Sequence, residues 1–199
     1  MTDEGVDEDK RATLRRFAAL GAAAPFSGFT GESDSDAPDA IAGYVSATPG
    51  AHFSKIRDDL QLGTGETQHH LRRLVGDGTL EQRADGDYQR YFPAGQFSTF
   101  EQVTLGYLRR DTPRGMLVAL LRDPDLTASE IATQLGVSAP TVSNYAADLE
   151  AAGLLSRTDG YTVQDPETVL LLLVRYADSF DADAATLASV ADELVQYDP

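Results

Sequence analysis

The spacing of apolar residues predicts a helical unit that occurs twice along the chain. In the first half, Ile41 and Tyr44 are three positions apart, as are Leu71 and Leu74, which is the spacing of residues on one helical face. Two short segments rich in β-forming residues flank residues 84–87 and predict a hairpin with Asp-Gly in its turn. The same order of helices and hairpin returns in the second half.

A constant offset of 75 residues relates the two copies. Ser54 and Ile56 recur as Ser129 and Ile131 without a gap. Further matches at this offset are Leu60 with Leu135, Leu74 with Leu149, Gly78 with Gly153, and Leu80 with Leu155. Each copy has the order helix, tight turn, helix, strand, hairpin, strand, which is the outline of a winged helix-turn-helix. Repeats of this kind decide the fold before any single element does.

The predicted fold class is therefore mainly α with small β wings (α+β). It comprises two tandem winged helix-turn-helix modules joined by a helix, plus C-terminal helices. Residues 27–38 are rich in Ser, Gly and Asp and are typical of a linker. The predicted boundaries are an acidic, flexible N-terminal arm at 1–37, module 1 at 38–95, a linker helix at 96–110, module 2 at 111–165 and C-terminal helices at 166–199.

Periodicity and turn residues give the expected elements within these boundaries. A short helix is expected at 13–24, and Gly63 and Gly65 are expected to form the turn of module 1. The other expected helices are 38–47, 53–60, 66–75, 98–109, 111–121, 129–135, 140–151, 166–179 and 184–197. The expected strands are 79–83, 88–92, 154–157 and 161–163, so the second hairpin is the shorter one.

Residues 169–174 are apolar without interruption, and such a helix must be buried on most sides. The burial could occur within the chain. A dimer interface is the more economical use of the run, so we expect a homodimer formed through the C-terminal or linker helices.

Charge is the most unusual part of the composition. Across 199 residues there are 32 acidic and 16 basic side chains, which gives a net charge of −16. Nucleic-acid binders usually carry a basic excess. One interpretation is a halophile-type surface, since Lys10 and Lys55 are the only lysines. The other is a protein that avoids DNA and binds a basic protein partner.

The composition also excludes several classes of protein. The chain has no cysteine, which rules out disulfides and cysteine-ligated zinc. No apolar stretch reaches the length of a membrane span. Residues 13–17 resemble a twin-arginine export signal, but acidic residues precede them and the expected spacer is missing. We therefore expect a cytoplasmic protein that does not enter membranes.

The helix at 66–75 has the composition of a DNA-recognition helix. Thr67, Leu71 and Leu74 share one face and are expected to be buried. The opposite face carries Glu66, Gln68, His69, Arg72 and Arg73. Gln can pair with adenine and Arg with guanine, while Arg or His can contact phosphate. The alternative is a solvated helix face that happens to be polar.

The first hairpin adds two candidate DNA contacts. Arg83 and Arg90 lie in its strands, on either side of the tip formed by Asp85, Gly86 and Asp87. Because carboxylates at the tip would repel phosphate, we expect the two arginines, not the tip, to contact DNA.

The corresponding helix of module 2 has a neutral surface. Thr141, Ser143 and Asn144 are its candidate DNA contacts, and Ser138 is expected to cap its first turn. Without Lys or Arg on this helix, phosphate contact would depend on backbone amides, hydroxyls and the nearby Arg157. The competing role is that of a packing or dimerising copy of the fold.

Both modules resemble winged-helix regulators of the MarR/ArsR type. Residues 38–180, with the segments GTGETQHHLRRL and TPRGMLVALLRDP, resemble the tandem winged-helix transcriptional regulators of haloarchaea. The resemblance implies a cytoplasmic regulator that binds double-stranded DNA and is often dimeric. Residues 1–37 lie outside it.

The sequence offers little support for catalysis. His69 and His70 are about 100° apart on a helix, so they cannot easily share a metal. His52 is expected to be a loop or cap residue, and neither a phosphate-binding glycine loop nor a serine elbow is present. We expect no enzymatic activity, no cofactor and no metal. The alternative to DNA binding is a protein-interaction adaptor built from winged helices.

Overall fold

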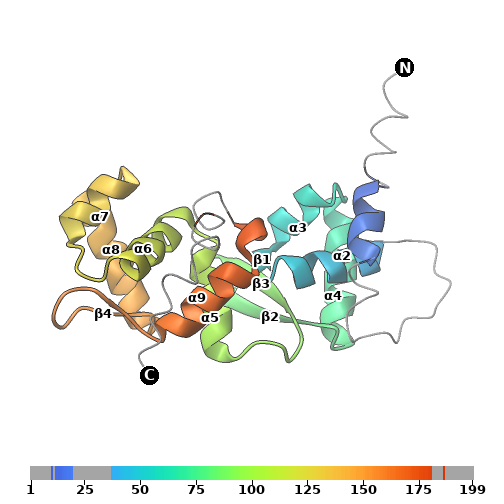
Figure 1. Cartoon of the computed structure of the whole chain (residues 1–199). Coiled ribbons are helices and arrows are strands. Elements are labelled where there is room, and N and C mark those ends of the chain that lie inside the picture. The colour runs from blue at the N-terminus through green and yellow to red at the C-terminus, as the bar shows by residue number, and fades with distance from the viewer. Residues whose placement is uncertain (1–9, 11, 20–36, 181–185, 187–199) are drawn as a thin grey trace, which may run out of the picture. The chain divides into compact units, whose positions relative to one another are not determined.

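The computed structural model describes residues 10, 12–19, 37–180 and 186 (Figure 1). The chain divides into two compact units, residues 1–98 and 99–199. Together their elements confirm the predicted class, mainly helical with small antiparallel sheets.

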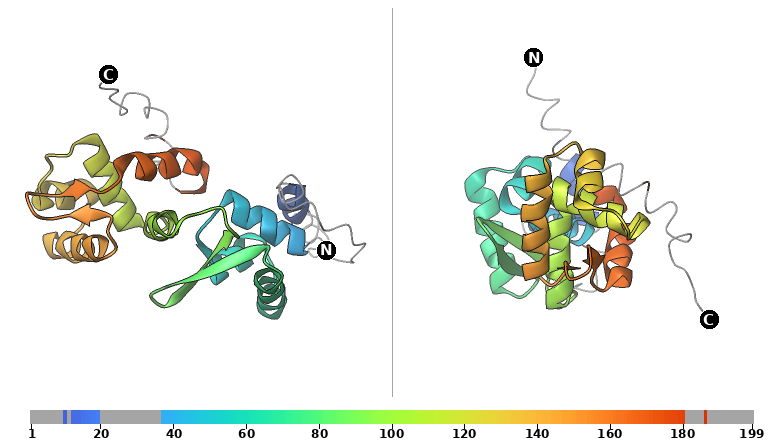
Figure 2. Two further views of the ribbon diagram at one scale, coloured as in Figure 1. Left: turned by 90° about the horizontal axis from the view of Figure 1, so that it is seen from below. Right: turned by 90° about the vertical axis from the view of Figure 1, so that its left-hand side faces the viewer.

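The first unit contains one winged helix-turn-helix. Its helices are α2 (Ala37–Ala47), α3 (Phe53–Asp59) and α4 (Thr64–Gly76), and its strands are β1 (Ala51–His52), β2 (Leu80–Asp85) and β3 (Tyr88–Pro93). The strands form an antiparallel sheet in the order β1-β3-β2. The β2–β3 hairpin, hereafter the wing, extends beside α4 (Figure 2).

The apolar positions that predicted these helices form the core of the first unit. Ile41, Ile56, Leu60, Leu71 and Phe92 are completely or almost completely shielded from solvent. Their burial explains why α2, α3 and α4 pack together, since each contributes one apolar face to a shared core.

Part of the predicted flexible arm belongs to this unit. Residues 12–19 are helical, in agreement with the helix expected at 13–24. Leu14, Phe17 and Ala18 pack against the core, and the Phe17 ring lies 5.1 Å from the Tyr44 ring. The apolar residues of this stretch give it a surface to bury, while the boundaries predicted for the arm at 1–37 stay a prediction.

The turn between α3 and α4 differs from the prediction. Gln61, not a glycine, adopts the left-handed conformation, with φ of 54°. Gly63 instead caps α4, where its backbone N–H donates to the Glu66 carboxylate at 3.2 Å. In the second copy, the position 75 residues later is Gly136, with φ of 65°. The two positions share a positive φ angle but not a residue type.

The second unit contains the second copy and three further elements. The copy comprises α6 (Asp111–Arg122), α7 (Ala128–Leu135), α8 (Ala139–Ala151), β4 (Leu155–Ser156) and β5 (Thr162–Val163). It is preceded by α5 (Thr99–Leu108) and followed by α9 (Pro166–Arg175) and a short 3₁₀ helix, Ala177–Ser179. The second hairpin is the shorter one, as predicted.

The repeat seen in the sequence is also a structural repeat. Ile131, Leu149 and Leu155 are buried like their counterparts in the first unit. Gly78 and Gly153 adopt positive φ angles of 80° and 75° after α4 and α8 respectively. Such angles favour glycine, which explains why this residue recurs after both α4 and α8.

The apolar run of α9 is mostly buried within its own unit. Val169, Leu170, Leu172 and Leu173 are shielded, and α9 packs on α5, the helix predicted as a linker. Leu171 remains 60% exposed and Val174 is exposed beside it. Burial within the chain, an alternative at the sequence level, therefore accounts for most of the run without a dimer.

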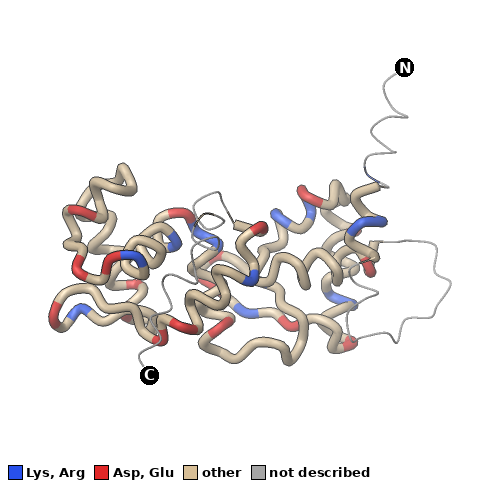
Figure 3. The backbone as a smooth tube through the Cα atoms, viewed as in Figure 1, with Lys and Arg blue, Asp and Glu red and all other residues tan. Residues whose placement is uncertain are grey.

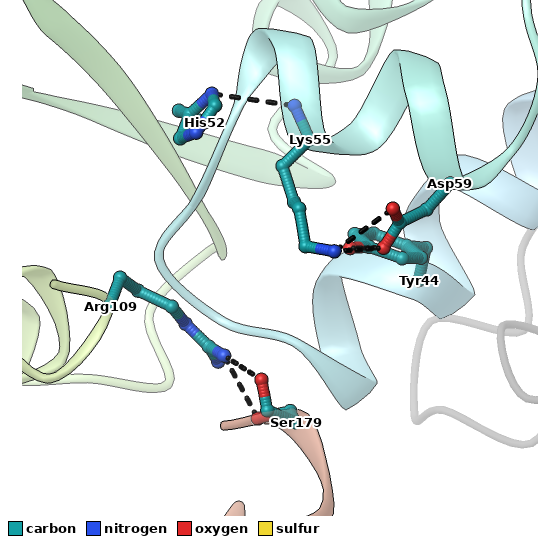
Figure 4. A network of polar contacts seen from close by, with 6 residues as sticks. All are labelled: Tyr44, His52, Lys55, Asp59, Arg109 and Ser179. Atoms are coloured by element: carbon teal, nitrogen blue, oxygen red, sulfur yellow. Dashed lines mark hydrogen bonds and ion pairs between the residues drawn. The ribbon is translucent and has the colours of Figure 1, made fainter. Parts of the chain in front are cut away.

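The 3₁₀ helix that follows α9 is held by Arg109, the residue directly after α5. The Arg109 guanidinium donates to the Ser179 carbonyl at 2.7 Å and to its hydroxyl at 3.0 Å (Figure 4). It also lies 4.4 Å from the centre of the Phe180 ring. The helix expected at 184–197 lies outside the described residues, apart from residue 186.

Candidate nucleic-acid interface

Helix α4 presents the two faces that its sequence predicts. Thr67, Leu71 and Leu74 are buried, and the Thr67 hydroxyl donates to the Gly63 carbonyl at 2.9 Å, which satisfies it inside the helix. On the opposite side the exposed positions are Glu66, Gln68, His69, Arg72 and Arg73. This polar surface is available to a ligand without disturbing the core.

A groove of about 530 Å³ lies between α4, the start of α3 and the wing. From α4 it is lined by Gln68 and Arg72, which are one turn apart on the same side. The lining side chains of the wing are Gln82, Asp87, Tyr88, Gln89 and Tyr91. We call this feature the α4–wing groove. It brings two of the predicted site residues, Gln68 and Arg72, together with side chains that the sequence analysis did not select.

Strand alternation explains which wing residues face the groove. Gln82 lies opposite Tyr91 in the hairpin register, and Ala84 lies opposite Gln89. Residues directly opposite one another place their side chains on the same face of a hairpin, and successive residues alternate between faces. Gln82, Gln89 and Tyr91 therefore share one face. The alternation could have grouped them from sequence, but the direction of α4 could not have been deduced from it.

Arg90 does not have the role expected for it. Its side chain is only 3% exposed, donates to the Gly50 carbonyl at 2.9 Å and forms an ion pair with Asp85. Because its guanidinium is used inside the unit, the structure does not favour the DNA contact expected for Arg90. Arg83, directly opposite Arg90 in the register, is partly exposed on the face away from the groove.

The wing tip is less acidic than its sequence suggests. Asp85 is paired with Arg90, while Gly86 and Asp87 form a two-residue turn with Gly86 at φ of 59°. Asp87 is the exposed carboxylate of the tip and also lines the α4–wing groove. Tyr88 is 51% exposed, and its ring centre lies 5.0 Å from that of His52.

His52 caps α3, as the sequence analysis expected. Its Nδ1 accepts a hydrogen bond from the Lys55 backbone N–H at 3.4 Å (Figure 4). Burial, and after it the nearby charge of Arg90, lowers the pKa of His52. The imidazole therefore stays neutral at neutral pH, which the cap requires. The same helix is tied to α2 because Asp59 accepts from both Lys55, at 2.9 Å, and Tyr44, at 2.6 Å.

His69 and Arg73 are exposed on α4 but do not line the groove. The His69 ring contacts the ring of His70, with centres 5.3 Å apart. Among the described residues, no group of three His, Cys, Asp or Glu side chains could hold a metal ion.

Helix α8, the counterpart of α4 in the second unit, has a different surface. Ser143 and Asn144 are exposed, and Thr141 is partly buried. The Ser138 hydroxyl caps α8 by accepting from the Thr141 backbone N–H at 3.2 Å, and the two hydroxyls lie 2.8 Å apart. The cap was predicted correctly. The close contact with Ser138 leaves less of the Thr141 hydroxyl available to DNA.

Arg157 was the expected basic neighbour of α8. It forms an ion pair with Glu150, with 2.7 Å between nitrogen and oxygen, and both side chains are partly exposed. The bonded guanidinium lowers the pKa of Glu150. Any phosphate at this position would have to compete with that carboxylate.

Basic side chains do not gather into a single stripe. Figure 3 shows basic and acidic positions interleaved along both units. Of the four arginines considered for the first unit, Arg72 lines the groove, Arg73 and Arg83 lie on other faces, and Arg90 is buried. Within the described ranges, no helix is both long and apolar enough to cross a membrane.

Comparison with known families gives two adjoining matches. Residues 35–105 match a family model described as an N-terminal HTH domain, and residues 104–162 match a model of the MarR family. No curated protein and no solved structure shows a significant match to the chain. The predicted similarity to helix-turn-helix and MarR-type regulators is confirmed by these matches. The chain has the domain content of DNA-binding regulators, a type that is typically not enzymatic.

Proposed function

We propose that this protein is a cytoplasmic transcriptional regulator that binds double-stranded DNA, with α4 in the major groove. The observation that supports this most directly is the exposed pair Gln68 and Arg72 on α4, beside a groove closed by the wing. In winged helices, the recognition helix follows a short turn, as α4 does, and a helix of this size fits the major groove.

The chemistry of α4 suits base reading. Gln68 can form two hydrogen bonds with adenine, and Arg72 can do the same with guanine. His69 and Arg73, on the adjacent exposed surface, would contact the flanking phosphates, and Arg83 would do so from the wing. The first unit would then supply both the phosphate contacts that position the protein on DNA and the base contacts that read the sequence.

The second unit would contribute less to DNA affinity. Thr141, Ser143 and Asn144 can donate hydrogen bonds, but α8 carries no Lys or Arg. We propose that this unit makes secondary DNA contacts and supports a homodimer through the C-terminal or linker helices. The exposed pair Leu171 and Val174 on α9 is the apolar surface available for that dimer.

A protein-interaction adaptor is the second candidate function. The net charge of −16 and the neutral surface of α8 favour it. An adaptor would retain its partners in a pull-down after nuclease treatment and would enrich no DNA sites in genome-wide mapping. A regulator would enrich discrete sites, and a duplex taken from them would bind the purified protein.

The double variant Arg72→Ala, Arg73→Ala tests the role of α4 on such a duplex. Loss of a base-reading arginine costs about 1–3 kcal/mol, so we expect binding to weaken by at least tenfold in an anisotropy titration. The matched control is Arg15→Ala with Arg122→Ala, which removes the same charge from exposed positions outside α4, the wing and α9. If the control weakens binding as much as the α4 variant, α4 is not the recognition helix.

A further inference from the structure

We infer that the α4–wing groove binds one sugar–phosphate strand of duplex DNA, and that uncharged hydrogen-bond donors take the place of lysine and arginine in it. The inference rests on the proposed function and concerns the chemistry of phosphate contact. Its consequence is that the DNA contacts made in this groove depend weakly on salt concentration.

The donors converge from two separate elements. Gln82 and Gln89 come from the two strands of the wing and line the groove together with Gln68 of α4, whose amide is assigned to base reading. All three side chains are exposed, and none forms a hydrogen bond with another described residue. Each amide offers two N–H donors. The two wing amides, which neither the fold nor base reading uses, are the pattern expected of a site for an acceptor-rich ligand.

Two tyrosines add hydroxyl groups to this set. Tyr88 is half exposed at the tip end of the groove, and Tyr91 lies nearly buried at its wall. Burial raises the pKa of the Tyr91 hydroxyl, so it remains a protonated donor. Phosphate oxygens accept hydrogen bonds from amides and hydroxyls as well as from charged groups.

The position of the groove favours a backbone strand as its occupant. It lies between a helix proposed to enter the major groove and a hairpin beside that helix. The strand of DNA that borders the major groove must pass between these two elements. Bases would be contacted by the exposed surface of α4. The groove is bounded by α4 on one side and by the wing on the other, so the sugar–phosphate strand is the part of the duplex that would lie in it.

The charges in the groove nearly cancel. Arg72 is the cation of the lining and Asp87 is its carboxylate, while His52 is kept neutral by burial and by Arg90. Each phosphate neutralised by a cation releases counterions and adds about −0.9 to the slope of log K against log salt. Contacts from neutral amides add nothing to that slope. Binding through this groove should therefore persist at salt concentrations that abolish phosphate contacts made by charged side chains.

Salt titrations of charge-adding variants test the inference. Gln82→Lys and Gln89→Lys each place a cation in the groove, and Gln96→Lys places the same charge on an exposed loop of the same unit, away from the groove. Affinity for the mapped duplex would be measured from 0.1 to 2 M KCl, with circular dichroism as a check that each variant folds. We expect both groove variants to bind more tightly than wild type at low salt, and their slopes to steepen by about 0.9. The Gln96→Lys slope should match wild type.

The outcomes separate the inference from the proposed function. If wild type binds no mapped or mixed-sequence duplex at any salt concentration, the proposed function fails. If wild type binds but the slopes of Gln82→Lys and Gln89→Lys equal that of Gln96→Lys, the groove does not contact phosphate and the inference is overturned.

Discussion

At Gln61 the backbone adopts a left-handed conformation, which costs a residue with a side chain about 1 kcal/mol. The equivalent position of the second copy is Gly136, where this cost is absent. We therefore expect Gln61→Gly to raise the free energy of unfolding by up to about 1 kcal/mol, less the extra entropy of glycine in the unfolded chain. Urea denaturation followed by circular dichroism measures it.

The reciprocal substitution serves as the control for the turn. Gly136→Gln introduces a side chain at φ of 65° and should lower the stability of the second unit by about 1 kcal/mol. No atom lies within 4 Å of a Cβ at Gly136, so the loss would come from the backbone and not from a clash. A destabilised Gln61→Gly protein would show that the Gln61 side chain makes a contact worth more than the strain.

Arg90 is a residue whose charged group stabilises the fold through an ion pair and a hydrogen bond inside the unit. Removing the guanidinium breaks the ion pair with Asp85 and the hydrogen bond to the Gly50 carbonyl. Breaking one side of a buried ion pair commonly costs about 3–5 kcal/mol. We expect Arg90→Met to lose roughly 3 kcal/mol, because Asp85 is 19% exposed and water can partly replace the arginine. Chemical denaturation measures the loss.

Arg83→Met is the matched control for this substitution. Arg83 lies directly across the hairpin but is partly exposed, so its replacement should change stability by at most about 0.5 kcal/mol. Equal losses for the two variants would mean that the ion pair of Arg90 contributes nothing particular to the fold.

Among the elements, the helices with a long apolar period and the two hairpins were predictable, whereas strand β1 was not. The helix predicted at 66–75 is α4, Thr64–Gly76, because its three buried positions are fixed by spacing alone. Strand β1 has two residues and no period, and it exists because Ala51 and His52 pair with β3. A pairing between positions about 40 residues apart leaves no local pattern in the sequence.

The candidate site was predictable in its helix but not in its wing. Helical spacing placed Gln68 and Arg72 on the exposed face of α4, where the structure has them. Charge was the criterion used for the wing, and it selected Arg90, whose role depends on a carbonyl at Gly50. The glutamines of the wing carry no charge, so this criterion does not identify them as candidate contacts. Strand alternation nevertheless groups Gln82 with the residues that line the groove.

For the molecule as a whole, the net charge of −16 should make the folded state depend on salt. Like charges repel one another more strongly in the compact state than in the extended chain, and salt screens this repulsion within about 10 Å at 0.1 M. We therefore expect the thermal midpoint to rise by several degrees as KCl increases from 0.05 to 1 M. Calorimetry at fixed pH measures this rise.

A partly neutralised variant shows whether the rise comes from charge repulsion. Asp125→Asn, Asp159→Asn and Glu167→Gln replace exposed carboxylates of the second unit and bring the net charge from −16 to −13. Its midpoint should exceed that of wild type at 0.05 M KCl and approach it at 1 M, because screening removes the difference. A constant offset between the two proteins at every salt concentration would instead point to local effects of the three substitutions. With repulsion as the cause, salt would strengthen the fold under the same conditions in which the neutral donors of the α4–wing groove keep DNA bound.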